Sequence, residues 1–95
     1  MDTKTDEIIG TWYADQEYSD AGTYYNLKYI FASDGTVSEF WYDPTEGTLQ
    51  RQYDLFWERD NDGEYTLNDG KDFRKYMISD AKLCDVDFGL YYHRE

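Results

Sequence analysis

The sequence predicts an all-β protein, an antiparallel up-and-down meander of about eight strands that closes into a small barrel. Turn-forming Asp, Asn, Gly and Pro residues divide the chain into short runs rich in Tyr, Phe, Trp, Val and Ile. The links between these runs are short, and a parallel crossover needs about a dozen residues or more, so neighbouring strands pair antiparallel. Closure hides the edges of a sheet that no helix covers, and a half-open barrel is the alternative.

The elements follow from the turn signals in chain order. Thr5 can cap a short N-terminal helical turn over residues 6–9, with acidic residues in its first turn and Gly10 at its end. A chain of 95 residues supports one hydrophobic core, so residues 1–95 are expected to form a single domain. Strands are expected near residues 11–18, 23–32, 37–43, 48–59, 64–68, 72–79, 82–87 and 90–95.

Alternation along each strand predicts which side chains face the barrel interior. Arg51 falls on the inner face, where a guanidinium requires a partner because a buried unpaired charge costs several kcal/mol. The other side chains expected inside are Trp12, Ala14, Tyr25, Leu27, Tyr29, Phe31, Leu49, Tyr53, Leu55, Trp57, Tyr65, Leu67, Tyr76, Ile78, Cys84, Val86, Leu90, Tyr92 and Arg94.

The hairpin YIFASDGTVSEFWYD, residues 29–43, leaves two registers open. A two-residue type I′ Asp-Gly turn would place Trp41 outside, opposite Lys28. A type I turn with a G1 bulge would instead place Trp41 inside and Glu39 opposite Tyr29. We favour the first register because it keeps Glu39 out of the core.

Three features resemble the lipocalin superfamily, and within it the short bacterial, Bacteroidetes-type lipocalin-like domains. They are the G-x-W motif Gly10-Thr11-Trp12 that opens the first strand, the F-x-x-D-G-T hairpin at residues 31–36, and Arg94 in the last strand. The resemblance implies that Trp12 closes one end of the barrel and that Arg94 lies across it in a cation–π contact of roughly 0.5–2 kcal/mol. The chain is much shorter than true lipocalins and lacks their disulfides and C-terminal helix, so a large cavity is not implied.

Charge limits the classes of partner. The chain carries 21 Asp and Glu against 9 Lys and Arg, a formal charge of −12, which disfavours nucleic acid and anionic membrane surfaces. No apolar run is long enough for a membrane span. We expect a cytoplasmic protein as the sequence stands, and a secreted or periplasmic one if an export signal has been removed.

Catalytic groups are sparse. Cys84, the only cysteine, is expected to be a buried small hydrophobe, and the only histidine is His93. No nucleophile stands beside a base, so we expect neither an enzyme nor a cofactor. A weak calcium loop is conceivable from Glu58, Asp60, Asp62 and Asp69, although a hairpin turn explains the same residues more simply.

Two binding functions remain for a monomer or weak dimer. In the first, the barrel holds a small apolar or amphipathic ligand, although the same aromatic side chains could fill the interior. In the second, an acidic inhibitor or immunity/anti-defence module docks a basic partner through outward aromatic and acidic side chains. The ligand-binding candidates are Arg51, Tyr53, Trp57, Tyr29 and Tyr76, and the partner-binding candidates are Trp41, Glu39, Asp43, Asp54 and Phe56.

Overall fold

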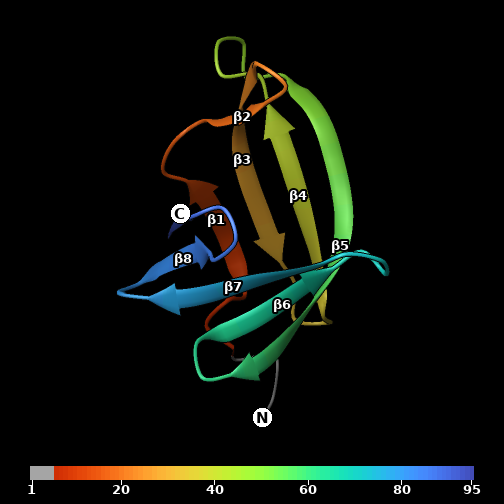
Figure 1. Ribbon diagram of the computed structural model, residues 1–95, viewed down its shortest axis with the longest axis vertical. Coiled ribbons are helices and arrows are strands. Elements are labelled where there is room, and N and C mark those ends of the chain that lie inside the picture. The colour runs from red at the N-terminus through yellow and green to blue at the C-terminus, as the bar shows by residue number, and fades with distance from the viewer. Residues whose placement is uncertain (1–5) are drawn as a thin grey trace.

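The computed structural model describes residues 6–95 as a sheet of nine antiparallel strands, with no helix among them (Figure 1). The strands are β1 (Gly10–Ala14), β2 (Tyr18–Asp20), β3 (Thr23–Phe31), β4 (Thr36–Tyr42), β5 (Leu49–Asn61), β6 (Glu64–Asn68), β7 (Phe73–Ser79), β8 (Lys82–Asp85) and β9 (Leu90–Arg94). Within residues 6–95 there is accordingly no helical segment of the length and apolarity that crossing a membrane requires.

The sheet closes because β1 pairs with both β9 and β3, which makes a barrel of eight strands. The closed barrel predicted from the sequence is therefore confirmed. The expected first strand divides in two at residues 15–17. β1 pairs with the second half of β3, whereas β2 is an extra strand that pairs with the first half of β3 only.

The expected N-terminal helical turn is wrong for the residues that the structure describes, and Thr5 lies outside them. The Ile9 N–H donates to the Asp6 carbonyl at 3.2 Å, which closes one turn without starting a helix. The Asp6 carboxylate accepts the Ile8 N–H at 3.1 Å. Such side-chain bonds compete with helical backbone bonds and favour a turn.

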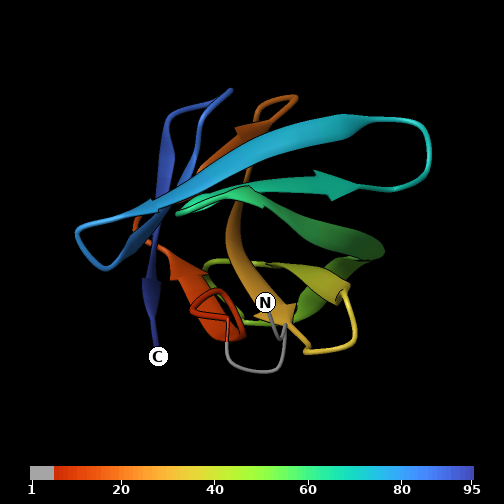
Figure 2. The same cartoon turned by 90° about the horizontal axis from the view of Figure 1, so that it is seen from below.

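The long strand β5 serves two parts of the molecule. Its first half pairs with β4 only, and from Phe56 onward it pairs with β6. The first half of β5, the end of β4, the start of β3 and β2 therefore extend beyond the barrel. We call this extension, residues 18–27 and 40–53, the arm. Figure 1 shows the arm above β6 and β7, which cross the lower part of the molecule. Figure 2 shows the molecule from below.

Aromatic side chains fill the barrel. Each of the largest is at most 1% exposed, and a cavity lined by Leu27, Tyr29 and Tyr92 among the described residues measures about 30 Å³. That volume has room for about one water molecule. The largest fully buried side chains are Trp12, Tyr29, Tyr65, Tyr76 and Tyr92.

The preferred hairpin register is wrong, and the bulged alternative is observed. Tyr29 lies opposite Glu39, and Leu27 lies opposite Trp41. The Gly35 N–H donates to the Ala32 carbonyl at 3.3 Å, and Gly35 has φ +90°, which is the left-handed conformation of a G1 bulge.

The inner face of β8 was also assigned wrongly. Leu83 and Asp85 are buried, whereas Cys84 is only partly buried and faces outward with Val86. Asp80 and Ala81 both have positive φ, and this two-residue turn fixes Ile78 opposite Leu83. The strand then ends at Asp85, whose carboxylate accepts the N–H groups of residues 87 and 88.

Candidate functional site

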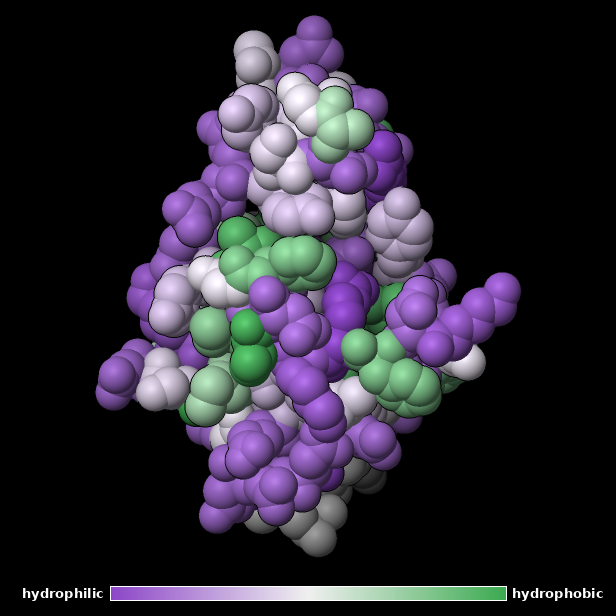
Figure 3. Space-filling view, viewed as in Figure 1, coloured by the Kyte–Doolittle hydropathy of each residue, from purple (hydrophilic) through white to green (hydrophobic). Residues whose placement is uncertain are grey.

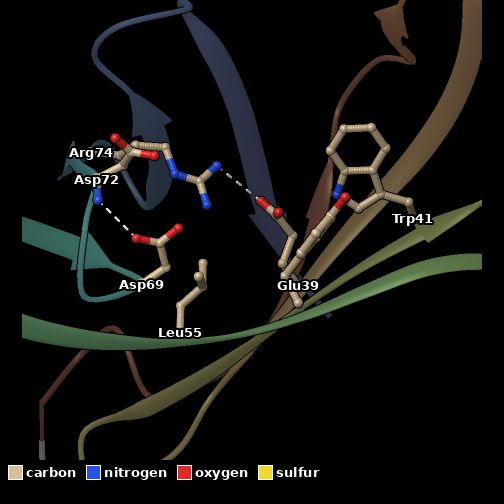
Figure 4. A pocket seen from close by; sticks show the side chains of 7 residues that line it. Glu39, Trp41, Leu55, Asp69, Asp72 and Arg74 are labelled. Atoms are coloured by element: carbon tan, nitrogen blue, oxygen red, sulfur yellow. Dashed lines mark hydrogen bonds and ion pairs between the residues drawn. The ribbon is translucent and has the colours of Figure 1, made fainter.

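The candidate site is an open pocket of about 260 Å³ between the arm and the loop of residues 69–72. We call it the mouth pocket. Figure 4 shows Trp41 and Glu39 on one side of it, and Asp69, Asp72 and Arg74 on the other. Its lining residues are Glu39, Trp41, Tyr53, Leu55, Asp69, Asp72 and Arg74.

An ion pair closes the bottom of the mouth pocket. Glu39, which is 3% exposed, accepts a hydrogen bond from Arg74 Nη1 at 3.2 Å and another from the Tyr29 hydroxyl. The hydroxyl oxygens of Tyr29 and Tyr76 lie 2.6 Å apart. Burial, and then the neighbouring Tyr76, raise the pKa of Tyr29 well above its usual range, so this hydroxyl keeps its proton. The Arg74 guanidinium therefore balances the negative charge of Glu39 within the protein.

Aromatic rings form the wall on the arm side. The Trp41 ring packs 5.1 Å from Tyr25 and 5.9 Å from Tyr53, measured between ring centroids. The Trp41 Nε1–H is buried and has no hydrogen-bond partner in the part of the chain that the structure describes. In Figure 4 the indole of Trp41 stands on the side of the pocket opposite Arg74.

Arg51 braces the same wall from the concave face of the arm. Its guanidinium lies 4.9 Å from the Trp41 ring centroid and 5.3 Å from that of Tyr25. Its Nη1 is 2.9 Å from an Asp20 carboxylate oxygen, so the partner that an inward guanidinium requires is Asp20. Both side chains are 40% exposed, which places this pair outside the barrel core.

Two carboxylates stand on the opposite rim. Asp69 Oδ1 accepts the N–H groups of Asp72 and Lys71 at 2.8 and 2.9 Å, and these bonds, that from Asp72 first, lower the pKa of Asp69, so it is ionised at neutral pH. The Asp72 side chain is exposed, and its carboxylate has no hydrogen bond or ion pair with any residue from 6 to 95. The rim therefore presents negative charge across from the aromatic wall.

The predicted ligand-binding residues separate into two groups. Tyr29, Tyr76 and Trp57 are packed in the filled interior, where Trp57 Nε1 donates to the Ala32 carbonyl at 2.9 Å. Tyr53, which is 43% exposed, lines the mouth pocket, and Arg51 braces its wall. Of the five predicted ligand-binding residues, Tyr53 is therefore the one that lines the mouth pocket.

The predicted partner-binding residues do not share one surface. Glu39 and Trp41 point to the concave side, whereas Asp54 and Phe56 point to the outer face of β5. Asp43 accepts the backbone N–H groups of residues 45 and 46 and so shapes the turn at the tip of the arm. In Figure 3 the hydrophobic side chains of one face form separate groups, over β7 and β8 and to the right, with hydrophilic side chains between them.

The predicted calcium residues are not gathered. Asp60 pairs with Lys75, Asp62 pairs with Arg59, and Asp69 belongs to the mouth pocket. Glu58 is exposed and has no polar partner in the described part of the chain. No group of three or more potential metal ligands occurs in residues 6–95.

The contact implied for the other end of the barrel is present. The Arg94 guanidinium carbon lies 4.4 Å from the Trp12 ring centroid, and Trp12 is opposite Arg94 in the β1–β9 pairing. Arg94 Nη1 donates to the Ile9 carbonyl at 3.0 Å, and Trp12 Nε1 donates to the Ile8 carbonyl at 2.8 Å. These bonds fasten the N-terminal segment over the end of the barrel.

Sequence reasoning missed Arg74 and Asp72 as site residues and assigned Asp69 to a different role. Arg74 has the same parity as Tyr76 on β7, so alternation would have placed it on the inner face. No signal in the sequence shows that the 69–72 loop approaches the arm. Comparison of the chain with protein-family models, curated proteins and solved structures finds no match.

Proposed function

We propose that this protein is a non-enzymatic binding module that holds a basic segment of a partner protein at the mouth pocket. The observation that carries the proposal is the placement of Asp69 and Asp72 across from Trp41 and Tyr53 around a pocket of about 260 Å³. A Lys or Arg side chain in this pocket would meet carboxylates on one side and aromatic faces on the other. Both interactions attract a cation, and Trp is the best aromatic partner for one.

The size of the available spaces favours this function over a ligand held inside the barrel. The cavity beside Tyr29 and Tyr92, of about 30 Å³, accommodates no lipid or dye, and typical small-molecule sites measure roughly 300–1,000 Å³. The mouth pocket is large enough for one long side chain. Under the proposal, Tyr29, Tyr76 and Trp57 are structural residues.

Charge supports a basic partner. With a formal charge of −12, the protein attracts cationic surfaces over a distance comparable to the Debye length and repels acidic ones. Arg74, the cation at the base of the pocket, already pairs with Glu39, so the two rim carboxylates dominate at the opening. Membership of the lipocalin-like superfamily remains part of the proposal, and it is supported by the strand pattern and the contact between Trp12 and Arg94.

Titration with a short capped peptide that alternates Lys and Thr tests the function, with a Glu-Thr peptide as its charge-reversed control. We expect the Lys-Thr peptide to bind, to weaken with rising salt, and to perturb the fluorescence of Trp41, which is the least buried of the Trp residues. Isothermal titration calorimetry gives the affinity.

A double variant locates the site. Asp69→Asn with Asp72→Asn should lower the affinity by about tenfold, since two partly screened ion pairs contribute together about 1.4 kcal/mol. The matched control is Glu58→Gln with Glu64→Gln, which removes the same charge from exposed positions outside the pocket. Equal losses in the two variants, or equal binding of the Glu-Thr peptide, would refute the proposed function.

A further inference from the structure

Among residues 6–95, the first half of β5 has a long edge that pairs with no strand, and this edge lies beside the mouth pocket. β5 pairs with β4 from Leu49 onward, but β6 joins its other side only at Phe56. In Figure 1 this upper half of β5 is the outer edge of the arm, and no strand lies beyond it. An open edge of this kind is a template for another strand.

The hydrogen bonds indicate which backbone groups face the open edge. The Trp57 N–H donates to the Gly35 carbonyl at 2.9 Å, so the backbone groups of Trp57 point to the β4 side. Successive residues of a strand point their N–H and C=O groups to opposite sides. The groups of Gln52 and Asp54 therefore point away from β4, toward the open edge.

The side chains along this edge distinguish its two faces. Tyr53 and Leu55 line the mouth pocket on the inner face. On the outer face the Asp54 carboxylate is exposed, where it accepts a hydrogen bond from Ser38 Oγ at 3.2 Å. A strand added at this edge would place one side chain next to Tyr53 and the pocket, and the following one next to Asp54.

We propose that the first half of β5 is a docking edge, to which an extended basic segment of the partner adds as an antiparallel strand. This inference rests on the proposed function and specifies how the partner is held. Backbone bonds to Gln52 and Asp54 would supply affinity, and a Lys or Arg opposite Tyr53 would enter the mouth pocket. Antiparallel addition continues the pairing found throughout the sheet.

The charge of the chain selects this occupant over a second copy. Two copies pairing through their β5 edges would each bring a formal charge of −12 and would align Asp54 residues near one another. Like charges facing each other across strands are destabilising. A basic segment instead neutralises Asp54 and the pocket rim.

Backbone N-methylation of the Lys-Thr peptide tests the docking edge. With Lys opposite Tyr53, the Thr residues lie opposite Gln52 and Asp54, and their N–H groups point toward β5. We expect N-methylation of the Thr residues to reduce affinity at least tenfold. N-methylation of the Lys residues should leave it within about twofold, because their N–H groups point to solvent. Amide hydrogen exchange should slow at Gln52 and Asp54 in the complex, by about tenfold or more.

The outcomes separate the two proposals. If both methylated peptides bind as well as the parent peptide and exchange at Gln52 and Asp54 is unchanged, the docking edge is refuted while the charge-dependent binding stands. If the Lys-methylated peptide alone loses affinity, the proposed register with Lys opposite Tyr53 is refuted. Protection of the same amides in a dimer without peptide assigns the edge to a second copy and refutes the proposal. Failure of the parent peptide to bind refutes both.

Discussion

Glu39 lies directly opposite Tyr29 across the β3–β4 ladder, and its buried carboxylate accepts the Tyr29 hydroxyl and the Arg74 guanidinium. This arrangement links three strands, since Arg74 comes from β7 on the other side of the barrel. It also separates the filled interior below from the mouth pocket above. The integrity of the site therefore depends on Glu39, whose ion pair with Arg74 closes the bottom of the pocket.

Replacing Glu39 by Ala should destabilise the protein by about 2–4 kcal/mol. Loss of the carboxylate removes the ion-pair partner of the Arg74 guanidinium and leaves the buried Tyr29 hydroxyl with Tyr76 alone. The cost is below that of a fully buried pair because the Arg74 side chain is 30% exposed. Chemical denaturation at neutral pH measures the change. Glu39→Gln keeps an acceptor for Tyr29 and should cost less; if the two variants are equally stable, the carboxylate does not have the role described.

The sequence predicted the barrel because its evidence is local: turn residues, alternation and short links all lie within neighbouring strands. The register of the β3–β4 hairpin could not be obtained in this way. An inward Glu39 looked unfavourable only because its partner Arg74 lies 35 residues further along the chain. For the same reason the mouth pocket was missed, since its acidic rim and its aromatic wall come from separate hairpins that only the closed barrel brings together.

Alternation failed on β8 because the turn before it, and not the hydrophobicity of its residues, sets the register. The sequence places Cys84 and Val86 in phase with an inner face, but the turn at Asp80 and Ala81 puts Leu83 inside. The sequence does not indicate that Asp80 and Ala81, which are not glycines, adopt positive φ values. By contrast, the contact between Trp12 and Arg94 was predicted from the resemblance.

Trp12 and Arg94 should contribute unequally to stability. Trp12→Ala removes a side chain that is 1% exposed and should cost about 3–5 kcal/mol. Arg94→Ala removes the cation–π contact and the bond to the Ile9 carbonyl, and should cost about 1–2 kcal/mol. Thermal and urea unfolding measure both values. A change within about 0.5 kcal/mol for Trp12→Ala, the range of ordinary surface substitutions, would contradict its role as the closure of the barrel.

Stability should fall steeply at alkaline pH. Burial raises the pKa of Tyr29 and Tyr76 well above the ordinary value of 10.0. The unfolded chain therefore loses these protons above about pH 10 while the folded protein keeps them, so the free energy of unfolding declines as pH rises. The contribution of each group approaches about 1.4 kcal/mol per pH unit.

Urea unfolding at a series of pH values up to the alkaline transition measures this slope, and tyrosinate absorbance reports which hydroxyls ionise. Tyr76→Phe should reduce the slope, whereas Tyr24→Phe is the control because Tyr24 is 57% exposed. A slope that is the same in the wild type and in Tyr76→Phe would contradict the buried, protonated state of the Tyr76 hydroxyl.

The outward orientation of Cys84 should make it reactive in the folded protein. Its side chain lies on the outer face between Met77 and Tyr91 in the pairings of β8, and it is the only cysteine of the chain. A thiol reagent such as an aromatic disulfide should modify it without denaturant. In a Cys84→Ser background, Leu83→Cys places a thiol at a fully buried position, where modification should require unfolding. Accessibility to a reagent in water depends on which side of the strand faces solvent. If the Leu83→Cys thiol reacted as fast as Cys84, the assignment of Cys84 to the outer face and of Leu83 to the inner face would be contradicted.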